Sequence, residues 1–196
     1  GGTIKLNGNY PAGTRNVALG DTALDSNVSG DDNVAVGSGA LTALTTGNNN
    51  HAFGQGALQS NVSGGQNVAI GRLALQANTA SNNTAVGHNA GYNNTSGVSN
   101  TAIGYAALVN NTTASNNTAV GYQSLYSNVT NNNTGLGWKA GYAITTGAQN
   151  TAVGHAALTA TTTGTTNTAT GFTALYSNTT GSSNTAYGDT SLYSNT

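Results

Sequence analysis

The feature that most constrains this chain is a five-residue repeat, Asn-x-Ala-x-Gly, which occurs eleven times with Gly in place of Ala once. Eight of the ten steps between repeats are 17 residues long and two are 16. The closing glycines, taken as position zero of each unit, are Gly20, Gly37, Gly54, Gly71, Gly87, Gly104, Gly121, Gly137, Gly154, Gly171 and Gly188. A unit this short cannot bury a hydrophobic face alone, so the copies must stack on one another.

Each unit contains two short segments in which small or apolar residues alternate with other residues. The first is the Asn-x-Ala-x-Gly segment, and the second begins with Ala-Leu at positions plus three and plus four in most units. Alternation with a period of two, broken by Gly and Asn after a few residues, predicts strands and argues against helices. We therefore expect two strands and two turns per unit, stacked at ~4.8 Å into a rod on the order of 50 Å long.

The predicted fold class is all-β, a parallel β-solenoid or β-roll of eleven coils with about 17 residues each. The array covers residues 16–196 and ends in an incomplete unit, while residues 1–15 are expected to form a leading half-coil or cap. Because solenoids need capped ends, we expect the array to continue in a longer protein or to stack on another subunit.

The apolar core that one chain can build is small. Asn, Thr, Gly and Ala make up 119 of the 196 residues. Ordering whole coils for so little apolar burial is unfavourable, so we expect three chains to share a core as a homotrimer. The pleat of the first strand sends Ala and Gly to one face and positions minus three and minus one to the other. The expected contact on the trimer axis, here called the apolar stripe, is Val36, Ile70, Val86, Ile103, Val120 and Val153.

An Asn stands at position minus four in every unit, although Asn is a poor strand former. Its amide both donates and accepts hydrogen bonds, so each copy is able to bond the copies in the coils above and below. We predict an axial Asn ladder, inside the coil or at its turn, formed by Asn16, Asn33, Asn50, Asn67, Asn83, Asn100, Asn117, Asn133, Asn150, Asn167 and Asn184.

The charge content excludes several classes of partner. The chain has four basic and five acidic residues and a net charge of −1, with no Cys. It offers no positive surface that would neutralise nucleic acid phosphates, and no apolar run long enough to insert into a membrane. We expect no nucleic acid partner, no membrane insertion and no cofactor.

The few titratable residues do not form a catalytic or metal-binding group in the predicted solenoid. His155 and Asp189 stand two coils apart, about 10 Å, and His88 and Asp21 four coils apart, about 19 Å. The acidic residues near the N-terminus lack the Gly-Gly-x-Gly-x-Asp pattern of calcium-binding β-rolls. We therefore predict neither an enzyme nor a metal site.

Position plus one carries ring side chains in six successive units. We call these residues the aromatic column: His88, Tyr105, Tyr122, Trp138, His155 and Phe172. A second aromatic column at position plus five consists of Tyr92, Tyr126, Tyr142, Tyr176 and Tyr193. Rings spaced one coil apart either stiffen the rod as a ladder or form an exposed stripe that binds a cell-surface glycan or a receptor.

The strand motif resembles the YadA-like head repeats of trimeric autotransporter adhesins. The repeat is also similar to Asn-Thr-Ala-Val-Gly-Tyr-x-Ala-Leu-Tyr-Ser-Asn-Thr-Thr-Gly arrays of bacteriophage tail fibres and bacterial surface proteins, as in 117–130 and 167–181. The resemblance covers residues 16–196. It implies a left-handed parallel β-roll, a homotrimer, and an extracellular location on a virion tail fibre or a bacterial cell surface.

Three functions fit these observations. The first is a fibre segment of a phage tail fibre or an adhesin, which provides rigid reach and attaches to a host or another surface. The second is a filament subunit that stacks coils end to end. The third is an ice-binding solenoid, suggested by the threonine column at minus three: Thr84, Thr101, Thr118, Thr134, Thr151, Thr168 and Thr185. An ice-binding face favours Thr-x-Thr on each strand, which the first strand supplies only at Thr168 and Thr170.

Overall fold

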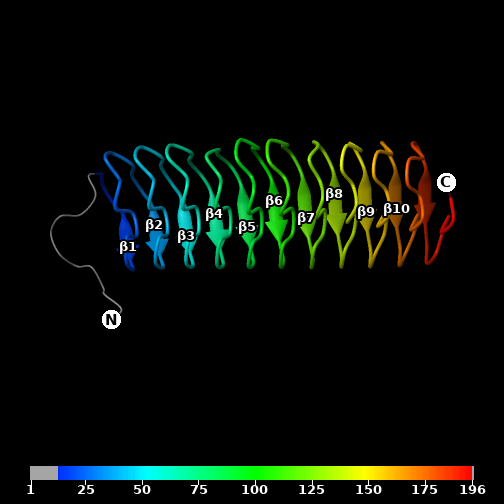
Figure 1. Ribbon diagram of the computed structural model, residues 1–196, viewed down its shortest axis with the longest axis horizontal. Helices are drawn as coiled ribbons and strands as arrows, with labels where there is room; N and C mark the ends of the chain where they lie inside the picture. The colour runs from blue at the N-terminus through cyan, green and yellow to red at the C-terminus, as the bar shows by residue number, and fades with distance from the viewer. Residues whose placement is uncertain (1–12, 196) are drawn as a thin grey trace.

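The computed structural model describes residues 13–195 and confirms the predicted parallel β-solenoid. Eleven strands of three residues each form a single sheet in chain order, one strand per coil, and the coils stack side by side into a rod (Figure 1). The strands are β1 (Val17–Leu19), β2 (Val34–Val36), β3 (His51–Phe53), β4 (Val68–Ile70), β5 (Thr84–Val86), β6 (Thr101–Ile103), β7 (Thr118–Val120), β8 (Thr134–Leu136), β9 (Thr151–Val153), β10 (Thr168–Thr170) and β11 (Thr185–Tyr187). The half-coil predicted at 1–15 falls mostly on residues 1–12, which lie outside the described residues.

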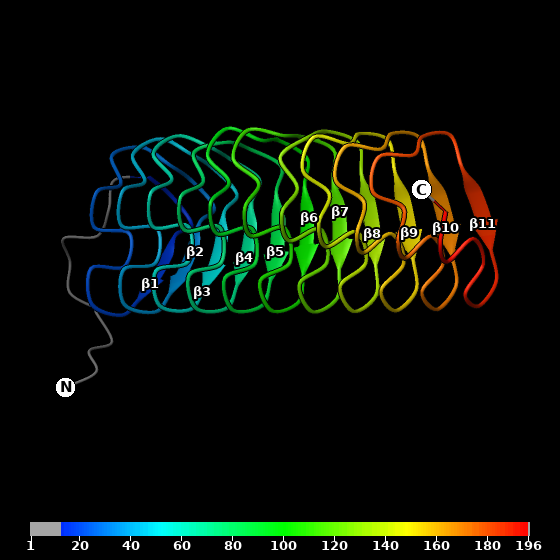
Figure 2. The same cartoon turned by 45° about the vertical axis from the view of Figure 1, so that its right-hand side comes forward.

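The strands pair in parallel and in register along the whole rod. Ala18 pairs with Ala35, and Ala35 with Ala52, and the same alignment continues to β11 even across the two units of 16 residues. The sheet therefore forms one continuous wall, as the turned view in Figure 2 shows. The shortened units leave the register unchanged because the missing residue lies in the turn and not in the strand.

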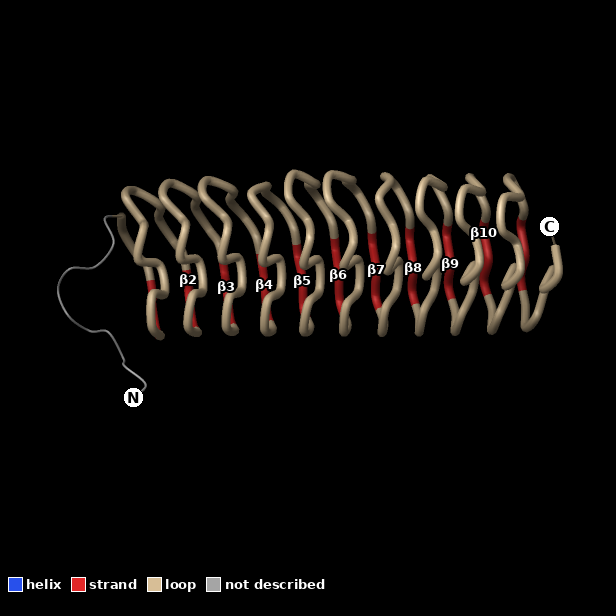
Figure 3. Tube along the Cα trace, in the orientation of Figure 1, coloured by secondary structure: helices blue, strands red, loops and turns tan. Residues whose placement is uncertain are grey.

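The second strand predicted in each unit is absent from the described coils, and this expectation is wrong. Figure 3 shows strand along one side of the rod and loop along the other. Positions plus two and plus four adopt positive φ, for example 55° at Leu24 and 51° at Leu58. Residues in the left-handed region therefore alternate with other residues along this segment, and its backbone is not extended. Its backbone still bonds between coils, because Leu41 N–H donates to the Ala57 carbonyl at 3.1 Å and Gly39 N–H to the Asp21 carbonyl at 2.9 Å.

The interior is narrow and filled with small side chains. The middle residue of every strand, Ala in ten strands and Gly135 in β8, is buried. Leucines at plus four, such as Leu58 and Leu125, face it and are fully buried. This matches the prediction that the pleat directs Ala inward and positions minus three and minus one outward. Among residues 13–195, no helix is long and apolar enough to span a bilayer.

The glycine at position zero forms the corner after each strand. At Gly37 the backbone has φ of +132°, and a Cβ there would lie 2.6 Å from the backbone of Gly54 in the next coil. A side chain is therefore excluded both by the backbone conformation and by the close approach of the coils. This explains why all eleven units keep Gly at this position.

Candidate functional site

The predicted Asn side chains lie on the inside of the coil and connect successive coils. The Asn33 Oδ1 atom accepts the backbone N–H of Asn50 at 2.9 Å, and the Asn33 Nδ2 atom donates to the Gly47 carbonyl at 2.9 Å. Direct amide–amide bonds add to this in some coils, for example from Asn50 Nδ2 to Asn33 Oδ1 at 3.1 Å. The ladder thus runs mainly through side chain to backbone bonds, which satisfy both ends of a buried amide.

The ladder is incomplete at one of the shortened units. The Asn117 Oδ1 atom accepts the Asn133 N–H at 2.9 Å, but its Nδ2 atom is buried and has no partner among the described residues. At the other shortened unit, Asn67 Nδ2 donates to the Ala80 carbonyl at 2.8 Å. Asn117 is therefore the ladder residue with an unsatisfied donor.

A second buried Asn column, at position plus seven, was not assigned a role from the sequence. Its residues close the opposite turn, where Asn61 Oδ1 accepts the Gly64 N–H at 3.0 Å. Some also bond between coils, as Asn94 Nδ2 does to Asn78 Oδ1 at 2.7 Å. Recurrence of Asn at plus seven in eight of the eleven units is the signal that points to this role.

The aromatic column forms two stacks along the rod. Tyr105 stacks on His88 at 5.5 Å and on Tyr122 at 5.3 Å between ring centroids. His155 stacks on Trp138 at 4.5 Å and on Phe172 at 4.9 Å, and the interplanar angles in both stacks are 6–17°. No stacking contact joins Tyr122 to Trp138 among the described residues.

The stacking of the rings determines which part of each ring is accessible to a ligand. Tyr105 is 48% exposed and Phe172 54%, while His88 is less exposed. Since neighbouring coils cover the faces within each stack, the exposed part is largely the ring edges. The edge of an aromatic ring carries the positive end of its quadrupole, and Tyr adds a hydroxyl.

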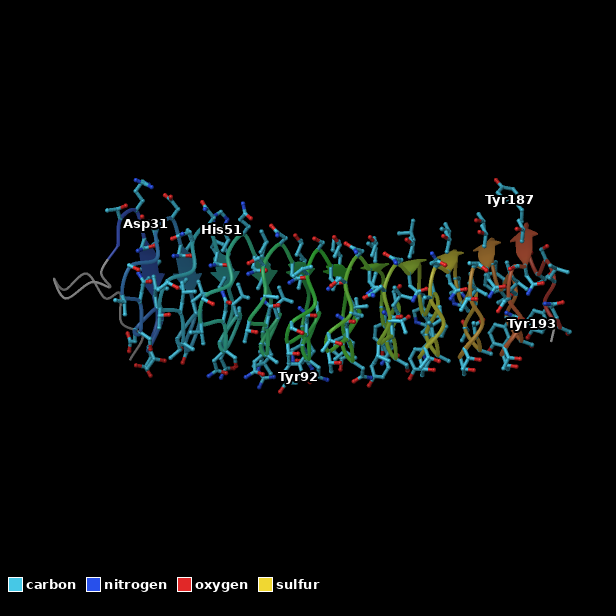
Figure 4. All side chains as sticks on the ribbon, turned by 90° about the horizontal axis from the view of Figure 1, so that it is seen from above. Asp31, His51, Tyr92, Tyr187 and Tyr193 are labelled. Carbon is cyan, nitrogen blue, oxygen red and sulfur yellow. The ribbon has the colours of Figure 1, made fainter. Side chains whose placement is uncertain are left out.

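Tyr92 of the second aromatic column lies on the side of the rod away from the sheet. Figure 4 shows Tyr92 projecting opposite to His51 and Tyr187, which belong to the strands. Lys139 links the two aromatic columns, because its Nζ atom lies 4.7 Å from the Trp138 ring centroid and 5.0 Å from that of Tyr142. The two columns therefore approach each other at this coil.

The outer face of the sheet carries the apolar stripe. Ile70 and Ile103 are 42% and 37% exposed, and Val36, Val86, Val120 and Val153 are half-buried. Leu136 and Tyr187 occupy the same position minus one and are exposed as well. An apolar side chain stands at this position in every described coil except at Thr170, and such a row along one face is a feature of surfaces that are covered by a partner.

The threonine column lies beside the apolar stripe on the same face. None of its seven hydroxyls forms a hydrogen bond to another residue in the described part of the chain. The threonines at position plus eight behave differently, since Thr95 Oγ1 donates to the Thr112 carbonyl at 2.9 Å and Thr45 Oγ1 to that of Val62 at 3.0 Å. The threonine column thus offers free hydroxyls to whatever covers the sheet.

Four titratable residues contact one another in two pairs. Arg72 Nη1 lies 3.2 Å from His88 Nε2, and Arg15 Nη2 donates to Asp32 Oδ2 at 2.7 Å. The hydrogen bond from Arg15 holds the pKa of the Asp32 carboxyl below its ordinary value. The described residues contain no group of three His, Cys, Asp or Glu side chains that would hold a metal ion.

Comparisons of this chain with protein families, with curated proteins and with solved structures find no match. The geometry of the rod and the columns that it exposes are therefore the features that bear on its function.

Proposed function

We propose that this chain is a structural segment of an extracellular fibre, either a phage tail fibre or a bacterial cell-surface adhesin. In this proposal it provides rigid reach and presents the aromatic column to a glycan or receptor on a host or another surface. The stacked coils, the uninterrupted sheet and the Asn ladder support the rigidity. The aromatic column, on the outside of the rod, supports the attachment role.

The observation that carries the proposal is the apolar stripe on the outer face of the sheet. The stripe is a single residue wide, follows the rod axis, and has no charged residue at its position in any coil. Three copies that turn this face inward would cover the stripes of one another and gain the apolar core that one coil lacks. We therefore propose a homotrimer with Val120 and Val153 at its shared axis.

Sedimentation velocity of the intact chain at micromolar concentration tests this assembly. We expect a discrete species of three chains that persists on dilution. The variant Val120→Asp would bury unpaired carboxylates at the axis and should dissociate or unfold the trimer, at a cost of several kcal/mol per chain. The matched control Thr113→Asp, at an exposed turn position, should leave the trimer intact.

A stable folded monomer in this experiment would contradict the proposal. Particles whose length grows with concentration would instead support the filament alternative. Mass measurement over a dilution series separates the three outcomes.

The free hydroxyls of the threonine column favour one other candidate function, ice binding. Regular hydroxyls on a rigid parallel sheet would hold ordered water, and the neighbouring Val and Ile methyl groups would sit between them. Because this function needs the sheet face exposed, it is incompatible with the trimer. Thermal hysteresis in a monomeric sample would support ice binding, and a trimer without hysteresis would exclude it.

A further inference from the structure

The acidic and basic residues are distributed unevenly along the rod. All five acidic residues lie at positions 21, 25, 31, 32 and 189, so residues 33–188 contain none. The same stretch contains two basic residues, Arg72 and Lys139. The long middle section of the rod therefore carries two positive charges and no negative one.

Both cations belong to the aromatic side of the rod. Arg72 occupies position plus one, next to His88 in the same column, and its Nε atom donates to Gln55 Oε1 at 3.0 Å. Lys139 lies against Trp138 and Tyr142. Neither cation forms an ion pair with a residue in the part of the chain that the structure describes. Both charges are therefore left for an external anion.

The rings between the two cations favour the same kind of ligand. In the stack from His88 to Tyr122 the ring faces that contact one another are covered, so the exposed part of these rings is largely their electropositive edges. The hydroxyls of Tyr105 and Tyr122 add hydrogen-bond donors at these edges. A neutral sugar that binds by stacking on a ring face finds few free faces here, whereas carboxylates and sugar oxygens find donors.

We propose that the surface formed by Arg72, the aromatic column and Lys139 binds a linear acidic polysaccharide that lies along the rod. Its carboxylates pair with Arg72 and Lys139, and its hydroxyl oxygens accept hydrogen bonds from the rings between them. The two cations are four coils apart, about 19 Å at the usual strand spacing, so a single sugar residue reaches only one of them. This inference rests on the proposed attachment role and names the ligand class.

The length of the ligand is part of the proposal. A chain that spans both cations binds twice to one rod, and parallel rods in a fibre multiply the contacts further. We therefore expect a polymer or a long oligosaccharide to bind where the corresponding monosaccharide does not.

Affinity electrophoresis with two polymers of the same backbone tests the proposal. Polygalacturonate carries a carboxylate on each sugar, and its fully methyl-esterified form carries none. We expect the intact chain to bind polygalacturonate, to release it as the salt concentration rises, and not to bind the methyl ester. The double variant Arg72→Gln, Lys139→Gln should bind at least about tenfold more weakly.

The control variant Arg15→Gln removes a cation that lies away from this surface, and it should bind like the unmodified chain. Melting curves of all variants show whether each rod is folded. Equal binding of the ester, undiminished binding by the folded double variant, or no binding of either polymer would overturn the proposal. If the chain is a trimer and binds neither polymer, this inference is wrong and the proposed fibre function stands. If the chain is a monomer, the proposed fibre function itself is wrong.

Discussion

The rod has two sections that share one backbone and differ on the outside. In residues 16–82, position plus one carries Asp21, Ser38, Gln55 and Arg72, and position minus three is mostly Val. In residues 83–195, position plus one is mostly aromatic and position minus three is always Thr. The buried positions show no such change, since Ala35 and Ala152 occupy the same place and are both fully buried.

This comparison shows which positions the fold controls. A side chain at the middle of the strand meets its counterpart one coil away, so a single change disturbs two neighbours, and this column stays nearly uniform, with Ala in ten strands and Gly135 in β8. An exterior side chain meets solvent and is free to vary between sections. Differences between the two sections therefore identify surface properties, while their common residues identify the scaffold.

The largest expected effect comes from the corner glycines and should be the same in both sections. Gly37→Ala and Gly87→Ala each place a Cβ against the next coil at a backbone with φ above +130°. Each variant should lose about 3 kcal/mol of unfolding free energy through strain and overpacking. Chemical denaturation measures this loss, and a large difference between the two variants would show that the sections do not share one scaffold.

The Asn ladder should give the next largest effect, again in both sections. Asn50 Nδ2 donates to the Gly64 carbonyl at 2.9 Å, and Asn150 Nδ2 to the Gly164 carbonyl at 2.9 Å. Replacement by Asp removes these donors, so each variant should lose about 2 kcal/mol more than Asn117→Asp, whose Nδ2 atom has no acceptor. If thermal melting shows that Asn117→Asp loses as much stability as the other two variants, the hydrogen bonds that the Asn Nδ2 atoms donate do not stabilise the coils.

Substitutions in the exterior columns should change the unfolding free energy less, and by different amounts in the two sections. Tyr105→Ala removes two ring stacks and should cost about 1 kcal/mol, whereas Gln55→Ala at the same position of the other section should cost less. Both free energies come from the same denaturation experiment. Equal losses would mean that the aromatic column contributes no stacking energy.

The smallest effect is a pH dependence confined to the first section. Because the pKa of Asp32 is lower in the folded than in the unfolded chain, its pair with Arg15 stabilises the fold above the unfolded pKa. This stabilisation is lost as the pH falls through the folded pKa. Melting temperatures of the intact chain and of Asp32→Asn should therefore differ slightly at neutral pH and converge in acid, and a constant gap would contradict the assignment.

The sequence predicted the coils and the inward Ala because a fixed period and a two-residue alternation fully determine them. It did not predict the left-handed residues at plus two and plus four, since Leu is an unusual residue at positive φ and gives no local signal. Gly91 and Gly141 replace Leu at plus four and also have positive φ. The replacement indicates a left-handed position only once the φ values are known.

The candidate site was less predictable than the fold. The sequence located the rings of the aromatic column one coil apart, but their orientation depends on side-chain torsions that packing decides. The spacing alone allowed exposed ring faces, which suit neutral sugars, but the rings stack on one another and expose largely their edges. The contact of Lys139 with two columns likewise depends on the shape of the turn.

The central claim is that the sheet face is the meeting surface of three chains and that the aromatic columns lie outside. End-on electron microscopy of the intact chain tests this directly. We predict a three-fold bundle in which each coil turns its sheet toward the axis and its second aromatic column, with Tyr92 and Tyr142, away from it. A lone rod with a single coil in cross-section, or a bundle with the sheets facing outward, would contradict the account.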